Sequence, residues 1–525
     1  MAGVETVESW EHSKNNFLNS TWTDLTWEKD VFSTLKFSYD RLPDETHTKC
    51  FLYCALYPED YVIQVDDLIH KWIGEGFFGN DGKRSVHYMH CHGGSIIEKL
   101  TLSCLLENVE VGNGIYVERS IKMHDVIHDM ALWIARDQDR NKNKVIVQED
   151  AQAISQDEVE NWEMVERISI LYCAKSWIPS KSWTNLETLL LRFESDCAIN
   201  GLQNIQYASQ LKVLELRSEK IVSAEGIGCL NLLQYLSLRV TVLMNASEFW
   251  RELENLKTLK VFHLFVGDAN FIPLQLIRNL PKLKVFRFHV EGLQDNTTEE
   301  GILEELECSS NLEELLVDIT TERGLNKLLK LAKLQSCIYG LDLRHVHSQV
   351  DGPLLLATMS KLKNLQYLGF LFLENVIDPS VCDTCCLSML QTVVISYCNT
   401  IHHLTWLKYA QLLRRLVVGR CDSIKEAIKG KIILEDKKDT IFPSLEVLSL
   451  NELPNLRSIH EGVLSFPSLS SIDVSNCGIL KKLPFDSNSA MAKLRLIWGE
   501  QEWWDNLEWD DPAAEATFHS KFQQR

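Results

Sequence analysis

Two histidines in the first third of the sequence have a spacing that could do chemistry. His124 and His128 are four residues apart, so both would lie on one face of a helix, with Asp125 and Asp129 beside them. Two histidines at this spacing can share a zinc ion. However, the pattern His-Asp-x-x-His lacks the general-base glutamate of the zinc protease motif, and no third ligand is suggested. We therefore expect no metal site at this pair.

Two further clusters combine residues that can bind metals, namely His87, His90, Cys91 and His92, and Cys382, Cys385 and Cys386. Neither cluster has the paired spacing of a known zinc site. We interpret them as loop residues and buried thiols. The sequence also contains no G-x-S-x-G nucleophile elbow and no Cys/His pair in a supporting context. We expect no catalytic residues, no metal ligands and no enzymatic activity.

Phosphate binding is a third chemistry, and it requires a glycine-rich loop between a strand and a helix. The phosphate-cradling motif G-x-x-x-x-G-K-[ST] does not occur. The nearest approach, residues 79–85 (Gly-Asn-Asp-Gly-Lys-Arg-Ser), has the wrong spacing and does not sit between a strand and a helix. No apolar strand ending in paired acids precedes it. We therefore expect no tight nucleotide binding or hydrolysis by these residues.

The element that organises the rest of the chain is a leucine-led repeat, L-x-x-L-x-L. Clear copies or variants start at Leu186, Leu211, Leu233, Leu256, Leu283, Leu312, Ile338, Leu365, Leu390, Leu413, Leu445, Leu469 and Leu494. The interval averages about 26 residues, within the 20–29 residues of leucine-rich repeats. Each repeat cannot bury its apolar side alone, so stacking produces one continuous core. Three copies end in cysteine at the Asn/Cys position, namely Cys398, Cys421 and Cys477.

Composition limits the class of partner and the compartment. The chain has 525 residues, a net charge of −20 and 15 cysteines at irregular intervals. The negative charge argues against nonspecific binding to nucleic acid or to anionic membrane. No apolar run approaches the 18 residues of a membrane span, and the first residues do not form a secretory signal. We expect free thiols in a reducing compartment, hence a cytoplasmic location or a peripheral one at the plasma membrane.

The region before the repeats has the pattern of a winged helix. Apolar spacing predicts helices at 31–39, 46–56, 66–73, 94–106 and 123–136, and a β-hairpin around Gly112-Asn113-Gly114 over 109–117. Asp44 is the expected N-cap of the second helix. We predict an α+β multidomain fold, a helical winged-helix domain followed by a leucine-rich-repeat solenoid with a parallel inner sheet. The expected boundaries are 1–140 for the winged helix, 141–160 for a linker, 161–510 for the solenoid and 511–525 for a tail.

Four stretches resemble plant nucleotide-binding leucine-rich-repeat (NLR) disease resistance proteins of the coiled-coil class. They are residues 49–60 (KCFLYCALYPED), 68–77 (LIHKWIGEGF), 122–125 (KMHD) and 503–509 (WWDNLEW). In that family a signalling domain and a nucleotide-binding domain precede the winged helix. The family binds ADP at rest and exchanges it for ATP on activation. Its repeats sense pathogen effectors or modified host proteins.

The resemblance also implies roles for single residues. The histidine of the family's Met-His-Asp signature contacts the β-phosphate of ADP, which carries over to His124, with Met123 and Asp125 as neighbours. Because the family's phosphate loop is missing, we expect a chain truncated at its N-terminus, without the nucleotide-binding core and with no cofactor of its own. The alternative is an ADP/ATP-dependent switch whose phosphate-binding part lies upstream. Nucleic-acid binding by the wing is not expected, because Glu110 and Glu118 flank it.

Charged and aromatic residues at the x positions of the repeats are expected to face the concave side. The candidates for partner binding are Lys257, Lys260, Lys284, Arg287, Glu313, Glu314, Tyr367, Arg414 and Arg415. Such residues on a rigid sheet suit protein recognition. The expected partner is a pathogen effector or a guarded host protein. The basic band from Lys257 to Arg287 has a second interpretation, as a docking site for a nucleotide-binding domain of the same or another NLR protein.

Overall fold

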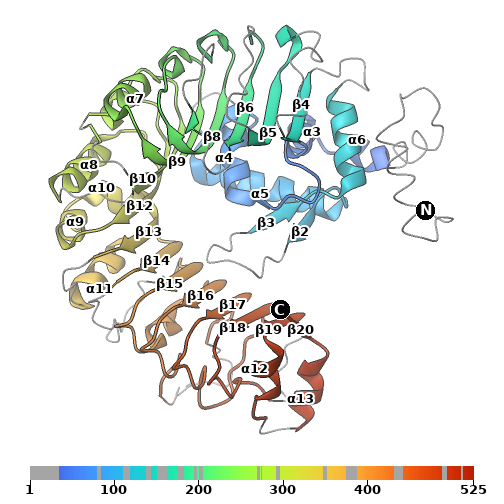
Figure 1. The fold of residues 1–525 in the computed structure, drawn as a ribbon, viewed down its shortest axis with the longest axis vertical. Helices are drawn as coiled ribbons and strands as arrows, with labels where there is room; N and C mark the ends of the chain where they lie inside the picture. The colour runs from blue at the N-terminus through green and yellow to red at the C-terminus, as the bar shows by residue number, and fades with distance from the viewer. Residues whose placement is uncertain are drawn as a thin grey trace.

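The structure is a computed structural model. It describes residues 35–79, 84–109, 119–136, 144–150, 162–173, 183–193, 198–199, 205–268, 272–273, 275–290, 296–346, 352–373, 387–430, 441–486, 493–509 and 512–525. The chain forms two units, a winged helix and a curved solenoid, and Figure 1 shows the winged helix seated inside the arc of the solenoid. None of the helices among these residues combines the length and the apolar character needed to cross a membrane.

The winged helix pairs short helices with a small antiparallel sheet, as the sequence predicts. After a helical stretch at 35–40, its helices are α3 (Glu45–Cys54), α4 (Val65–Glu75), α5 (Val86–Leu102) and α6 (Asp125–Ala135). The sheet has the order β1 (Ile63–Gln64), β3 (Ser120–Lys122), β2 (Glu107–Val109). The strands β2 and β3 form the base of the predicted hairpin, whose Gly-Asn-Gly turn lies outside the described residues.

Local signals explain three of the helix ends. Asp44 caps α3 as predicted, with its side chain accepting from the backbone N–H of His47. Gly76 ends α4 in the left-handed conformation, at φ 77°. The helix α5 begins eight residues before the predicted start, because Ser85 caps it and Gly93 lies inside it. A Cβ at Gly93 would lie 2.8 Å from Ile69 Cγ1, so this glycine serves the close packing of α4 and α5 and does not break the helix.

The solenoid has one parallel sheet whose strands follow chain order, as the repeat pattern predicts. Its strands are β4 (Val145–Asp150), β5 (Arg167–Cys173), β6 (Thr188–Phe193), β7 (Ala198–Ile199), β8 (Val213–Ile221), β9 (Tyr235–Leu243), β10 (Val261–Asp268), β11 (Val285–Val290), β12 (Glu314–Ile319), β13 (Ile338–Arg344), β14 (Tyr367–Leu371), β15 (Thr392–Ser396), β16 (Arg415–Gly419), β17 (Val447–Asn451), β18 (Ser471–Ser475), β19 (Leu496–Gly499) and β20 (Phe522–Gln524).

The return segments of the repeats lie on the outer side of the arc (Figure 1). They are 3-10 helices or short α-helices, namely η2 (Trp162–Met164), η3 (Ile205–Tyr207), η4 (Ile227–Cys229), α7 (Ala246–Leu253), η5 (Ile277–Asn279), α8 (Asn296–Cys308), α9 (Glu322–Leu328), α10 (Ala332–Cys337), α11 (Gly352–Lys361) and η6 (Thr405–Tyr409). Near the C-terminus α12 (Gln501–Asp505) and α13 (Pro512–His519) cover the end of the stack.

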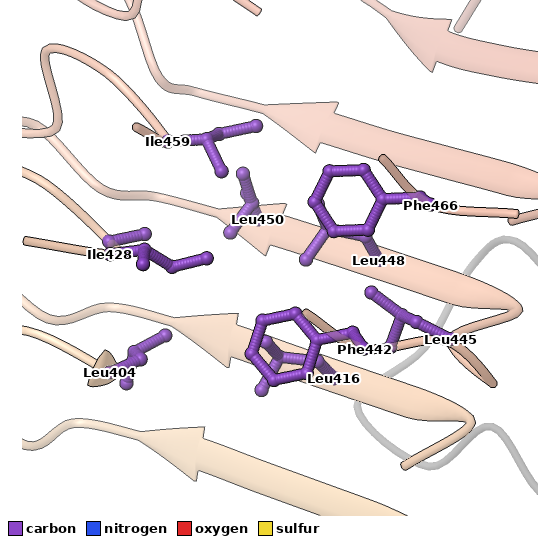
Figure 2. Close-up of a pocket in the computed structure, with 10 residues that line it drawn as sticks. Leu404, Leu416, Ile428, Phe442, Leu445, Leu448, Leu450, Ile459 and Phe466 are labelled. Atoms are coloured by element: carbon purple, nitrogen blue, oxygen red, sulfur yellow. The ribbon is translucent and has the colours of Figure 1, made fainter. Parts of the chain in front are cut away.

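A continuous apolar core runs between the sheet and the outer segments. Figure 2 shows part of it, where side chains from successive repeats point toward one another, namely Leu404, Leu416, Ile428, Phe442, Leu445, Leu448, Leu450, Ile459 and Phe466. The void among them has an entirely apolar lining, so we interpret it as a packing defect of the core. The ladder cysteines are buried, and the Sγ of Cys398 and of Cys477 donate to carbonyls of the preceding repeat.

The sheet extends beyond the predicted solenoid at both ends. Strand β4 lies inside the segment predicted as a linker, where Val145 pairs with Arg167 of β5. Val145 packs into the core of the winged helix and Ile146 into that of the repeats, so this strand joins the two units. Strand β20 lies in the predicted tail and pairs with β19. Both are end strands with one neighbour, so they lack the leucine pattern of a fully stacked repeat.

Candidate functional site

The winged helix docks on the concave face of the repeats through an apolar row. Neighbouring strands place Val213, Tyr235, Val261 and Val285 side by side in the register of the sheet. These four side chains are buried and belong to the same apolar cluster as the core of the winged helix. They occupy the second x position of L-x-x-L-x-L, which a solenoid exposes unless something covers it. The concave face of β8 to β11 is therefore an internal interface.

Helix α4 makes the closest approach to this row. Gly74 lies against β9, and a Cβ at this position would be 2.4 Å from Tyr235 Cβ and 3.2 Å from Val213 Cγ2. No side chain fits in that space without moving the helix. At the last residue of α4, buried Glu75 accepts from the hydroxyl of Thr188 on β6. The end of α4 is thus fixed to two strands of the solenoid.

A buried ion pair lies beside the apolar row. Lys71 of α4 is 2% exposed, and its Nζ lies 2.8 Å from Glu215 Oε2 on β8. Arg192 on β6 approaches Glu215 Oε1 at 3.1 Å. Burial alone would raise the pKa of Glu215, but Lys71 and Arg192 outweigh it and hold the pKa well below its usual range. The pair is therefore ionised at neutral pH and ties the two units together.

Further polar contacts continue along α4 and α5 toward β12. Arg287 of β11 binds Asp67 Oδ1 at 2.7 Å. The Nζ of Lys284 donates to the backbone carbonyl of Arg84 at 3.0 Å. The carboxylate of Glu313 accepts from the backbone N–H of Val86 at 2.6 Å, at the start of α5. An acidic side chain at a helix N-terminus also complements the helix dipole.

A cluster of imidazoles and one carboxylate closes this end of the interface. His70 of α4 and His90 of α5 face Glu314 of β12, with Nε2-to-carboxylate distances of 3.1 Å and 3.2 Å. The other ring nitrogen of His70 lies 3.1 Å from His263 Nε2 on β10. Burial alone would raise the pKa of Glu314, but the neighbouring His90 and His70 outweigh it and hold the pKa well below its usual range. Burial and nearby Arg287 hold the pKa of His263 well below the usual value.

The solenoid also carries a row of stacked residues along one rim, just past the C-terminal ends of its strands. His345 stacks on Phe372 at a centroid distance of 4.7 Å, and Phe372 stacks on Tyr397 at 4.4 Å. Arg420 lies 4.9 Å over the ring of Tyr397 and pairs with Glu452 at 2.9 Å. All five have positive φ values of 48–56°, which turn each side chain onto the next repeat. Phe372 remains 39% exposed. We call this row the rim stack.

Comparison with known proteins identifies the family. The family model "Disease resistance protein Winged helix domain" matches residues 56–131, and the model "Plant disease resistance protein RPS2-like, leucine-rich repeats" matches residues 361–498. The disease resistance protein RPS5 of Arabidopsis thaliana is 31% identical over 535 residues, which cover 99% of this chain. The chain has the winged helix and the leucine-rich repeats of plant disease resistance proteins. This confirms the resemblance drawn from the four sequence stretches.

A second relative of this disease resistance family has similar values. The disease resistance protein SUMM2 of Arabidopsis thaliana is 31% identical over 536 residues, again 99% of this chain. The matches cover 58% of the length of RPS5 and of SUMM2, so this chain spans about three fifths of these relatives. Among solved structures, an internalin of Listeria monocytogenes has 14% identity and a TM-score of 0.33, covering 71% of this chain and 88% of its own.

The family's Met-His-Asp signature lies at the start of α6. Met123 is buried, and its backbone carbonyl accepts from the N–H of Asp60 at 3.0 Å. His124 is the N-cap residue, with a side chain that is 53% exposed and paired with Asp125. Asp125 also accepts from the N–H of Val126 at 2.6 Å. The buried methionine thus anchors the turn into α6 and leaves the histidine side chain at the surface.

The predicted partner residues divide into three groups. Lys284, Arg287, Glu313 and Glu314 contact the winged helix of the same chain, so the structure does not present them to an external partner. Lys257 does not lie on the concave face. Its Nζ binds the carbonyl of Glu254, at the end of α7, and the carbonyl of Asn279 in η5 of the next repeat. Lys260 lies directly before β10 at the first x position, and its N–H donates to the carbonyl of Gln234.

Tyr367, Arg414 and Arg415 form the third group, on β14 and around the start of β16, in the half of the arc opposite the winged helix (Figure 1). Tyr367 donates to Asp342 Oδ1 at 3.0 Å. Arg414 is exposed and lies 3.8 Å from Glu446. These three residues remain candidates for contact with another protein.

The histidine and cysteine clusters do not stay together in the fold. His87 and Cys91 lie on the exposed side of α5, 3.6 Å apart, whereas His90 turns into the interface and His92 packs near Phe78. These residues lie on a helix, so the predicted loop is wrong. Cys382, Cys385 and Cys386 lie outside the described residues. Of the ten cysteines whose side chains the structure describes, which are all free, six are buried and four are exposed.

Two features of the site escaped the sequence analysis. The rim stack has a detectable signal, because its five members each lie seven residues after the first residue of a repeat. Reading that column would have shown His, Phe, Tyr, Arg and Glu in successive repeats. The histidine–glutamate contacts have no such signal, since His70, His263 and Glu314 are far apart in the sequence. Only docking of the winged helix brings them together.

Proposed function

We propose that this chain is the recognition and autoregulatory part of a plant immune receptor, which acts by binding proteins and not by catalysis. The observation that carries the proposal is the division of the arc. The concave face of β8 to β12 is occupied by the winged helix, while β14 to β19 form the opposite half of the arc (Figure 1). One half of the solenoid binds the winged helix of the same chain, and the other half binds a partner protein.

The half of the solenoid formed by β14 to β19, which we call the open half, has the properties of a protein-recognition surface. The rim stack places two aromatic rings and an arginine in a rigid row, and these residue types dominate binding energy at protein interfaces. The rings are held by regular strands, so little conformational entropy is lost on binding. Following the family, the partner would be a pathogen effector or a guarded host protein, met in the cytoplasm or at the inner face of the plasma membrane.

The occupied half supports the autoregulatory part of the proposal. Lys71, Asp67 and Glu75 connect α4 to β8, β11 and β6, so a force on the repeats is transmitted to the winged helix. In intact relatives the nucleotide domain would lie next to the winged helix. A partner bound to the open half would then change the state of that domain through the rigid sheet.

We further propose that this chain binds no nucleotide tightly by its own residues. His124 offers one hydrogen bond or one charge to a phosphate, worth about 1.5–3 kcal/mol. The upper figure corresponds to only about a hundredfold in affinity. The His124 contact would matter only together with a phosphate loop. Isothermal titration of the purified chain with ADP tests this, and micromolar or tighter binding would contradict it.

The recognition surface is tested by replacing its two rings. The double variant Phe372→Ala/Tyr397→Ala should reduce recovery of the specific partners of the tagged chain from leaf tissue by about thirtyfold or more, since a single interface hot spot is worth about 2 kcal/mol. Tyr207→Ala is the matched control, because Tyr207 is 53% exposed but lies on the outer helix η3. Quantitative mass spectrometry after crosslinking measures recovery. Equal partner sets for the wild type and the double variant would refute the proposal.

A further inference from the structure

The cluster formed by His70, His90 and Glu314 has the chemistry of a metal site, and His263 adjoins it. His70 and His90 come from two helices of the winged helix, and Glu314 comes from the solenoid. His70 is fully buried, and the other two are largely buried. The cluster therefore lies inside the interface between the units, away from the rim stack and from His124. We call it the interface triad.

The distances within the interface triad match the edges of a metal tetrahedron. His70 Nε2 lies 3.0 Å from His90 Nε2 and 3.1 Å from Glu314 Oε1, and His90 Nε2 lies 3.2 Å from Glu314 Oε2. Zinc binds imidazole nitrogen and carboxylate oxygen at about 2.0–2.2 Å in a tetrahedral arrangement, which separates adjacent ligand atoms by about 3.3 Å. The three groups already face one common point, so a cation requires only small movements of the side chains.

The neighbours of the interface triad orient both imidazoles for metal binding. His70 Nδ1 lies 3.1 Å from His263 Nε2, which is placed to accept a proton from Nδ1 in the tautomer whose Nε2 lone pair is available to a metal. His90 Nδ1 lies 3.9 Å from Asp66 Oδ1, which favours the same tautomer. A partner on the second ring nitrogen is the arrangement found around histidines that bind zinc.

One ligand atom of the interface triad is buried without a hydrogen bond. Among the described residues, Glu314 Oε1 has no donor in hydrogen-bonding geometry, although His70 Nε2 lies nearby. A buried carboxylate oxygen without a donor is costly. The cation Arg287 lies close by, but Asp67 holds it at 2.7 Å. With Asp66, Asp67 and Glu314 on one side and Arg287 on the other, the surroundings favour a cation.

We propose that His70, His90 and Glu314 bind one zinc ion that links the winged helix to the solenoid. Two imidazoles and one carboxylate form a ligand set that zinc accepts, with a fourth position for water. A second trio, Asp67, His70 and His263, also has its ligand atoms close together. It is the poorer set because Asp67 is taken by Arg287. The proposal departs from our expectation of no metal, because Glu314 joins the two histidines only in the folded chain.

Zinc titration of the purified, metal-depleted full chain tests the proposal. We expect one zinc ion per chain, and a four-coordinate visible spectrum when cobalt replaces zinc. Glu314→Gln and His90→Gln should each weaken zinc binding by about a hundredfold or more, beyond the 10- to 100-fold typical of residues that only support a ligand. His87→Gln is the matched control, because His87 lies on the exposed side of the same helix. Its zinc binding should equal that of the wild type.

The outcomes separate the interface triad from zinc bound elsewhere. Circular dichroism establishes that each variant is folded, and zinc should raise the Tm of the wild type and of His87→Gln but not of Glu314→Gln. The absence of stoichiometric zinc in the wild type would overturn the proposal. So would binding that persists in both ligand variants, or binding that is lost in His87→Gln, which would indicate the surface pair His87 and Cys91. These readouts do not depend on any protein partner, so they test zinc binding independently of the proposed function.

Discussion

Replacing Glu215 by glutamine should loosen the winged helix from the repeats. The substitution keeps the size of the side chain and removes its charge. Lys71 then loses the anionic partner that lies 2.8 Å away. Its own side chain stays buried, 2% exposed, near the rings of Tyr57 and Tyr235. Arg192, the other partner of Glu215, is less buried and gains water more easily. The cost of the substitution therefore falls mainly on Lys71.

The magnitude follows from the burial of Lys71. Removing one partner of a buried ion pair costs about 3–5 kcal/mol, because the remaining charge is left without compensation. Burial alone would lower the pKa of Lys71, but Glu215 outweighs it and the pKa is raised well above the usual value. The stabilisation by Lys71 is therefore complete below its unfolded pKa and is lost as the pH rises from there through the raised pKa. Because the pKa of Glu215 is lowered, the stabilisation by the ionised Glu215 is lost only in acid. The effect should be constant around neutral pH.

Hydrogen exchange of the α4 amides measures the effect. Most of α4 is buried, between the core of the winged helix and the strands of the solenoid, so its amides exchange only when the docked helix opens. A loss of 3–5 kcal/mol corresponds to exchange that is faster by about a hundred- to several-thousandfold. Glu187→Gln is the control, because Glu187 pairs with Arg167 and Lys212 in a more exposed setting. Its effect should stay below about 1 kcal/mol.

The double variant Lys71→Met/Glu215→Leu provides the decisive comparison. Replacing a buried ion pair by apolar residues of similar volume is often neutral or stabilising, so protection of α4 should recover most of the loss. The reasoning is refuted if Glu215→Gln leaves exchange of α4 unchanged. It is also refuted if the double variant protects α4 less than the single variant does.

Two further predictions concern packing and pH. Gly74→Ala should weaken docking by about 1–3 kcal/mol, because its Cβ would overlap Tyr235. Gly94→Ala on α5 is the control, because a Cβ at Gly94 would lie 4.0 Å from its nearest neighbour. This variant should leave the free energy of unfolding unchanged or raise it by up to about 1 kcal/mol. Hydrogen exchange of the α4 amides compares the two variants. Burial and Asp318 raise the pKa of Asp342 to about 6, so the native state holds this proton more tightly than the unfolded chain does. Stability from Asp342 is therefore present in acid and lost as pH rises from about 4 to 6. Relative to the wild type, Asp342→Asn should gain about 3 kcal/mol between pH 4 and pH 8 in urea unfolding, and a constant difference would contradict this.

The register of one repeat shows why a pattern alone was insufficient. Leu256 and Leu259 are both buried leucines three residues apart, and either fits the first position of L-x-x-L-x-L. The pairing of Val261 with Tyr235 selects Leu259 and moves Lys257 off the concave face. The repeat interval alone does not distinguish these two registers, because both place apolar residues at the L positions. Backbone hydrogen bonds to the neighbouring strand decide it.

The sequence by itself determined the architecture, because stacking demands apolar residues at a fixed interval, and caps such as Asp44 act within a few residues. It also determined the family, through continuous motifs that survive without knowledge of the fold. Only the tertiary structure decided the use of each surface. The sequence predicts partner binding for Lys284, Arg287, Glu313 and Glu314, yet they contact a domain of the same chain encoded some two hundred residues earlier. The reason is that strand periodicity fixes which side of the sheet a residue faces, whereas docking fixes what covers that side.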